Sequence, residues 1–144
     1  MILVLGVGNE LRGDDVFGLL VVKELKKQIK RPDVILWSGE APENFIGEVK
    51  GTVDKLIVID TALLGKKPGT LGLVKPEMIS KQAISTHKLP LSLLAEILEP
   101  KEAYFICAQP KTIEFGAKPS KEILSAVKEA EKLVLKIISS SPLP

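Results

Sequence analysis

The sequence is short of several residue types, and each shortage excludes a class of protein. Its 144 residues include one cysteine, Cys107, so no internal disulfide is expected. Arginine occurs only at positions 12 and 31, while lysine is abundant and the formal net charge is +2. Because guanidinium groups are the preferred bidentate donors to phosphates and base edges, a dedicated nucleic-acid-binding protein is not expected.

Long apolar runs are also missing. No stretch reaches the roughly 18 residues that a membrane-spanning helix requires, so membrane insertion is not expected. Residues 1–5 are apolar, but no basic segment precedes them and no small-residue cleavage site follows, so they do not have the pattern of a secretory signal. We therefore expect a cytoplasmic protein.

The remaining composition, 45% hydrophobic and 26% charged, is typical of one compact domain. Apolar runs predict strands, and stretches of helical periodicity lie between them. The expected strands span 2–7, 33–37, 54–60, 70–74 and 103–108, and the expected helices span 16–29, 43–50, 89–98 and 120–138. This alternation predicts a three-layer α/β domain over 1–138, with a mostly parallel twisted sheet of about five strands and helices on both faces. We expect the tail, 139–144, to fray.

Acidic side chains are distributed unevenly. Of only five aspartates, Asp33 and Asp54 precede strands as ordinary turn residues, whereas Asp14, Asp15 and Asp60 follow or end strands. If strands 2–7 and 54–60 are neighbours, these last three lie at the carboxyl edge of the sheet, where open α/β sheets bind ligands. Alternatively, Asp14 or Asp15 caps the next helix, and Asp60 is a turn former.

The only histidine, His87, lies in a turn-rich stretch before a predicted helix. A lone histidine is more often a surface or packing residue than a ligand. Two carboxylates and one imidazole from separate loops would nevertheless make a three-ligand set with open positions, suited to zinc or nickel. Cys107, inside an apolar strand, is expected to be a buried inert thiol.

Two nucleotide-binding motifs are incomplete in the first loop. Gly6-Val-Gly8 begins like the dinucleotide fingerprint, but Leu11 occupies the third glycine position, and the second strand ends in Trp37 rather than in an acid. Gly8 and Gly13 match the outer glycines of a phosphate loop, but acidic residues follow them where lysine and serine or threonine are needed. Carboxylates there would repel phosphate and attract cations.

Three motifs in order resemble the [NiFe]-hydrogenase maturation endopeptidases, which trim the carboxyl-terminal extension of the hydrogenase large subunit. They are the opening Leu5-Gly-Val-Gly-Asn-Glu-Leu-Arg-Gly-Asp-Asp15 followed by Gly18, the strand Leu56-Ile-Val-Ile-Asp60, and Thr86-His87-Lys-Leu-Pro-Leu91. The resemblance implies that Asp15, Asp60 and His87 are catalytic and face a metal, and that this metal is nickel carried by the large-subunit precursor. Whether the enzyme also holds its own metal ion stays open.

The resemblance is strongest to one subgroup of the family, and the chain differs from the common family pattern at one position. Together with the motif around His87, the segments Gly39-Glu-Ala-Pro-Glu-Asn44 and Ala108-Gln-Pro110 are most similar to members that serve membrane-bound, energy-converting hydrogenases. Many members carry Asp-Gly-Gly after the second strand, whereas this chain has Trp37-Ser38-Gly39. Trp37 cannot perform the role of the family's aspartate. Glu40 is the nearest acidic residue.

Two other functions use similar sequence features. A peptidyl-tRNA hydrolase-like esterase also opens with a strand and Gly-x-Gly-Asn, but it needs a histidine soon after that motif, and His87 is far from it. A non-catalytic metal-sensing module would use the same three ligands. A peptide-bond cleavage assay separates it from an endopeptidase, whether the latter hydrolyses through a metal-bound water or through aspartate bases.

Overall fold

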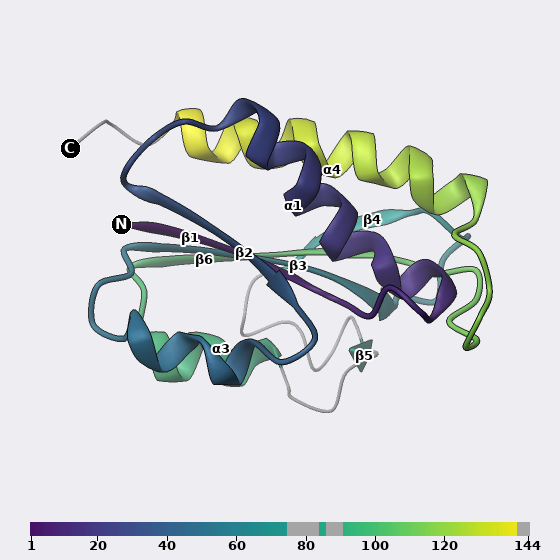
Figure 1. The fold of residues 1–144 in the computed structure, drawn as a ribbon, viewed down its shortest axis with the longest axis horizontal. Helices are drawn as coiled ribbons and strands as arrows, with labels where there is room; N and C mark the ends of the chain where they lie inside the picture. The colour runs from purple at the N-terminus through teal and green to yellow at the C-terminus, as the bar shows by residue number, and fades with distance from the viewer. Residues whose placement is uncertain (75–83, 86–90, 141–144) are drawn as a thin grey trace.

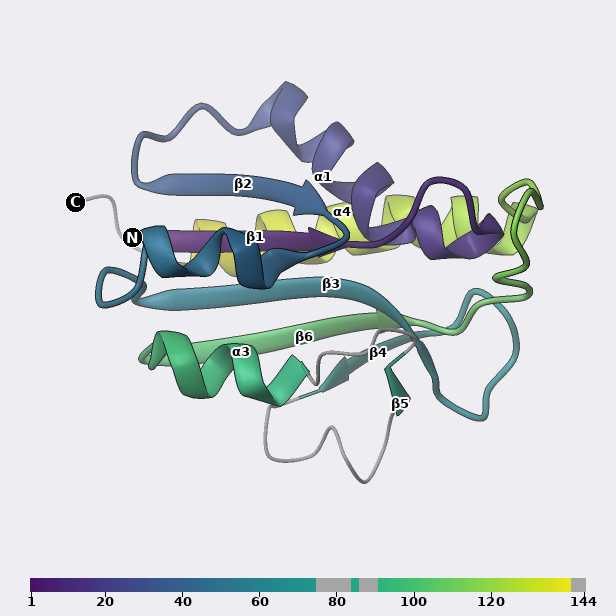
Figure 2. The same ribbon diagram turned by 60° about the horizontal axis from the view of Figure 1, so that its bottom comes forward.

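A twisted sheet forms the centre of the fold. The computed structural model describes residues 1–74, 84–85 and 91–140. Within them the strand order is β2-β1-β3-β6-β4, with β5 paired to β3 off this path (Figures 1 and 2). The strands are β1 (Ile2–Val7), β2 (Val34–Gly39), β3 (Lys55–Leu63), β4 (Leu71–Val74), β5 (Ile84–Ser85) and β6 (Glu102–Ala108). β2, β1, β3 and β6 are parallel, which confirms the mostly parallel sheet.

Helices cover both faces of the sheet, as the sequence predicts. α1 (Phe17–Gln28) and α4 (Lys121–Ser139) lie on one face (Figure 1). α3 (Leu91–Leu98) lies on the other, and the 3-10 turns η2 (Pro42–Asn44) and η3 (Ile46–Glu48) pack on that face as well. The result is the predicted three-layer arrangement.

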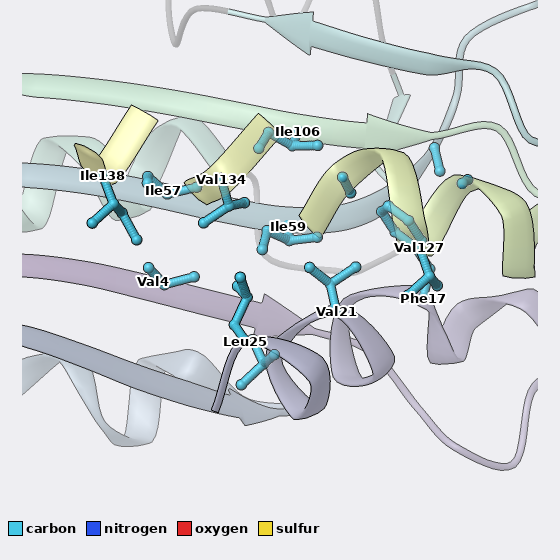
Figure 3. Packing of buried hydrophobic residues seen from close by; sticks show 14 of the residues in the cluster. Val4, Phe17, Val21, Leu25, Ile57, Ile59, Ile106, Val127, Val134 and Ile138 are labelled. Atoms are coloured by element: carbon cyan, nitrogen blue, oxygen red, sulfur yellow. The ribbon is translucent and has the colours of Figure 1, made fainter. Parts of the chain in front are cut away.

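Each helical layer closes its own apolar core. Between the sheet and the α1/α4 layer, β1, β3 and β6 contribute buried Val4, Ile57, Ile59 and Ile106, which meet aliphatic side chains of both helices (Figure 3). On the opposite face, alternate residues of the same strands pack on Ile46, Leu94 and Leu98. Because both faces are buried, these strands are continuously apolar rather than alternating.

Three predicted elements differ in detail. The helix expected over 43–50 is instead the pair of 3-10 turns, in a segment where Gly47 disfavours an α-helix. β3 runs on to Leu63, because β6 and β5 continue to pair with it beyond the end of β1. β4 is antiparallel to β6, since only residues 64–70 connect β3 to β4, and a parallel crossover needs about a dozen or more.

The two ends of α4 differ in how fully they are described. Ser120 is its N-cap, as predicted, and the Ser120 Oγ accepts a hydrogen bond from the Ile123 N–H at 3.2 Å. α4 ends at Ser139, and residues 141–144 of the predicted tail lie outside the described part of the chain.

A topological switch point lies between β1 and β3. From β1 the chain passes through α1 to β2 on one side, then returns through η2 and η3 to β3 on the other side. The connection after β1 therefore crosses one face of the sheet, and the connection that leads to β3 crosses the other. In such a sheet, the crevice at the carboxyl ends of β1 and β3 is the expected ligand site. The pairing of β1 with β3 ends at Gly6 and Ile59, so Asp60 is the first β3 residue beyond it.

Candidate active site

Asp15 enters the site from the loop that follows β1. It lies in the 3-10 turn η1 (Gly13–Val16) and is only 3% exposed. Its backbone carbonyl accepts a hydrogen bond from the Asn9 N–H at 3.2 Å. Its carboxylate Oδ1 accepts from the Thr61 hydroxyl at 2.9 Å, so the side chain is held toward β3.

Asp60 enters from β3 itself and is fully buried. Its Oδ1 accepts the Thr61 N–H at 2.7 Å. Thr61 therefore joins the two candidate carboxylates, because its backbone amide binds Asp60 and its hydroxyl binds Asp15. This confirms that the acidic residues after β1 and within β3 meet at the same edge of the sheet.

The part played by Thr61 was not predicted from the sequence. Its position directly after Asp60 was the available signal, because neighbouring residues of a strand point to opposite faces. The Thr61 side chain therefore lies on the face of the sheet that α1 covers, where the turn before α1 can reach its hydroxyl at the end of the strand. The structure shows that Asp15 of this turn accepts the hydroxyl's hydrogen bond.

Asp14 has a different task from the helix cap considered for it. Neither η1 nor α1 has a side-chain cap. The buried carboxylate instead accepts from the Lys111 N–H, the Ser120 N–H and the Ser120 hydroxyl, each at 2.7 Å. Asp14 thus ties the loop after β1 to the loop before α4, roughly one hundred residues away in sequence.

The third predicted ligand, His87, lies outside the described residues. In the part of the chain that is described, no group of three histidine, cysteine, aspartate or glutamate residues is arranged to hold a metal ion. The set of Asp15, Asp60 and His87 therefore stays a prediction. The structure links the Asp15 and Asp60 carboxylates through Thr61, and carboxylate oxygens are ligands that hard and borderline cations accept.

Cys107 lies beside the site but is protected from reacting. It pairs in register with Asp60 across β3 and β6, and its side chain is buried in the core. Burial, together with a smaller contribution from the nearby Asp60 charge, raises the pKa of the thiol from 9.0 to about 12. The thiolate needed for nucleophilic attack is therefore scarce at neutral pH, as expected for an inert thiol.

The region that replaces the common Asp-Gly-Gly also borders the site. Glu40 follows β2, and its Oε1 accepts a hydrogen bond from the Asn9 Nδ2 at 3.1 Å. Trp37 stacks on Phe45 with ring centroids 5.7 Å apart, so it packs against the fold as an apolar residue. Glu40 is thus the acidic group that β2 brings to this edge.

Comparison with known proteins identifies similar chains. The hydrogenase maturation protease family model matches residues 19–137. The hydrogenase 3 maturation protease of Escherichia coli is 31% identical over 130 residues, covering 86% of this chain and 82% of that protein. The hydrogenase 2 maturation protease of Escherichia coli is 32% identical over 137 residues, covering 85% and 82%.

A solved structure agrees with these matches. The crystal structure of a [NiFe] hydrogenase maturation protease from Thermococcus kodakarensis superposes with a TM-score of 0.81 at 30% identity, covering 96% of this chain and 92% of that one. Among the described residues, none of the helices is both long and apolar enough to cross a membrane.

Proposed function

Because the chain belongs to the hydrogenase maturation protease family, we propose that it removes the carboxyl-terminal extension from the large-subunit precursor of a [NiFe]-hydrogenase. The observation that carries this proposal at the level of residues is the pair Asp15 and Asp60, joined through Thr61 at the switch point. The motif around Gly39 and Ala108 favours a precursor from the energy-converting, membrane-bound hydrogenases.

Nickel enters this proposal as part of the substrate. Asp15 and Asp60 supply carboxylate oxygens, and His87 supplies an imidazole, so the three together leave coordination positions open. A precursor that carries nickel on its own ligands would present the ion to these groups. Docking would then occur in the correct register only when the metal has been inserted.

Hydrolysis itself needs a base and a proton donor. A water molecule attacks the carbonyl carbon of the scissile bond and gives up one proton, and the departing amine takes up one proton when the C–N bond breaks. A buried aspartate carboxylate at the switch point suits the first proton transfer, and its conjugate acid can supply the second. A carboxylate-based endopeptidase is therefore the reaction class that we assign.

The proposal is tested by processing assays with purified enzyme and nickel-loaded precursor, read by the mass of the released peptide. We expect Asp15→Asn, Asp60→Asn and His87→Ala each to abolish processing while circular dichroism shows a folded protein. Glu129→Gln, an exposed carboxylate on α4, is the matched control and should leave the rate unchanged.

Each possible failure has a distinct meaning. If one of the three variants processes the precursor at the wild-type rate, the assignment of that residue is wrong. If the wild-type enzyme binds the nickel-loaded precursor but releases no peptide, the chain is instead a non-catalytic module that senses the metal.

A further inference from the structure

One threonine in the buried strand β3 contacts both candidate carboxylates. The Thr61 N–H donates to the Asp60 Oδ1 at 2.7 Å, and the Thr61 hydroxyl donates to the Asp15 Oδ1 at 2.9 Å. Successive residues of a strand point to opposite faces, so the side chains of Asp60 and Thr61 leave β3 on different sides. Thr61 therefore connects Asp15, which comes from the turn before α1, to a carboxylate that starts on the other face of the sheet.

The two contacts depend on different parts of Thr61. The bond to Asp60 uses the backbone amide and joins neighbouring residues, so any residue other than proline at position 61 can make it. The bond to Asp15 uses the side chain and joins residues 46 positions apart, so it requires a hydroxyl at position 61. A side-chain substitution at this position therefore changes the surroundings of Asp15 and retains the amide that binds Asp60.

The hydroxyl of Thr61 is held in a fixed direction. Thr61 is fully buried, and it lies opposite Ala108 where β3 pairs with β6. A β-branched side chain has few χ1 rotamers, and a closely packed strand deforms little, so the hydroxyl has little freedom to turn. A hydrogen bond to a carboxylate is stronger than one between neutral groups. The direction of the hydroxyl therefore sets the direction of the Asp15 side chain.

We propose that Thr61 is a positioning residue for the peptidase reaction: through its hydroxyl, β3 holds the Asp15 carboxylate in the orientation that cleavage of the nickel-loaded precursor requires. This inference rests on the proposed function and adds a residue to it. Thr61 acts through Asp15 and touches neither the scissile bond nor the ion. Because its amide also binds Asp60, one buried residue sets the orientation of the two carboxylates relative to each other.

Two substitutions at position 61 separate the hydroxyl from the shape of the side chain. Thr61→Val replaces the hydroxyl with a methyl group of similar size, so the Asp15 Oδ1 loses this donor while the strand keeps a β-branched residue. Thr61→Ser keeps the donor and removes the methyl group. The matched control is Thr52→Val, which removes a hydroxyl that donates to the Val49 carbonyl at 2.6 Å just before the opposite end of β3.

The variants are compared by kinetics and by crystal structure. Processing of nickel-loaded precursor is followed at a temperature where circular dichroism shows that every variant is folded. We expect Thr61→Val to lower kcat about tenfold to a hundredfold and to leave KM within about twofold, because a misplacement of about 1 Å can cost about a hundredfold in rate. Thr61→Ser should recover most of kcat, and Thr52→Val should match wild type. Without precursor, the Asp15 side chain should turn away from β3 in Thr61→Val and keep its place in Thr61→Ser.

Each outcome supports or overturns the inference, and the two readouts keep it separate from the proposed function. An unchanged kcat in Thr61→Val overturns it, and so does a Thr61→Ser enzyme as slow as Thr61→Val, since the hydroxyl would then not be the group that acts. A rise in KM alone would assign Thr61 to precursor binding and would also overturn it. If the wild-type enzyme fails to cleave, the proposed function is wrong. The crystal structures still decide whether Thr61 orients Asp15, because an Asp15 side chain that keeps its place in Thr61→Val overturns the inference.

Discussion

Two adjacent aspartates in one loop perform different tasks. Asp14 turns its carboxylate toward two backbone amides and a hydroxyl from the far end of the chain, whereas Asp15 turns toward Thr61 at the switch point. The side chains share a sequence context and a high degree of burial. Their partners distinguish them, and those partners become visible only after the chain has folded.

The first prediction concerns Asp14, whose replacement by asparagine should be costly. An asparagine retains one acceptor oxygen and places an NH₂ group where the second carboxylate oxygen accepted, so the Lys111 N–H loses its acceptor. Leaving a buried donor unpaired and removing charge-assisted bonds should lower the free energy of unfolding by about 2–3 kcal/mol. Urea denaturation measures the loss, with Glu10→Gln in the same loop as the control. A loss below roughly 0.5 kcal/mol, the range typical of surface substitutions, would contradict this role.

The second prediction concerns Cys107 and alkaline pH. Its thiol has a pKa of about 12 in the fold, against 9.0 ordinarily, so above pH 9 the unfolded chain releases this proton more readily than the folded one. The stabilising contribution is therefore complete below pH 9 and is lost as pH rises toward 12, at no more than about 1.4 kcal/mol per pH unit. Lysines titrate in the same range, so the measurement is the difference between wild type and Cys107→Ala in free energy of unfolding. A difference that stays constant from pH 8 to pH 10.5 would show that the thiol titrates normally.

At the scale of elements, strongly apolar segments could be predicted and irregular ones could not. β1 and β3 are long apolar runs, so their composition predicts strands. Ser120 stands one residue before α4, whose hydrophobic residues recur at helical spacing, so the sequence predicts this helix and its N-cap. The reversed direction of β4 depends on how β3 and β6 pair, which a local pattern does not contain. The tie between Asp14 and Ser120 was missed for the same reason, because it spans 106 residues.

The third prediction concerns Gly18 at the start of α1, where the helix backbone lies directly against the sheet with no side chain between the two. A Cβ on Gly18 would lie 2.5 Å from the Ile59 carbonyl oxygen and 2.6 Å from that of Val7. Gly18→Ala should therefore push α1 away from β1 and β3, outweighing alanine's better helix propensity, and lower the free energy of unfolding by about 1–3 kcal/mol. Processing should slow as well, because α1 directly follows the turn that holds Asp15.

A matched glycine isolates the effect of space. A Cβ on Gly47, in η3, would meet nothing within 4 Å, so Gly47→Ala should be close to neutral in stability and in processing. Thermal unfolding of the two variants side by side measures the contrast. Equal melting temperatures would mean that α1 and the sheet can move apart to accommodate the Gly18→Ala methyl group without a loss of stability.

At the scale of the whole molecule, two helical layers fix the sheet, and the sheet positions the chemistry. Asp15 reaches the switch point from the α1 side, and Asp60 projects from a strand packed on both faces. Such buried strands deform little, so the two carboxylates are held ready before the substrate arrives. Under the proposed function, a site prepared in this way would distinguish a nickel-loaded precursor from one that lacks the ion.

The last prediction concerns that ion. If nickel in the precursor completes its coordination with Asp15, Asp60 and His87, metal recognition and alignment of the scissile bond become one event. Alignment of reacting groups lowers barriers by several kcal/mol, so nickel-free precursor should be processed orders of magnitude more slowly even where it still binds the enzyme. Adding zinc to the enzyme should not restore the rate, because the ion must arrive on the substrate's own ligands. The measurement is the rate of peptide release from nickel-loaded and nickel-free precursor, and equal rates would favour an autonomous protease that uses its own metal or its paired carboxylates.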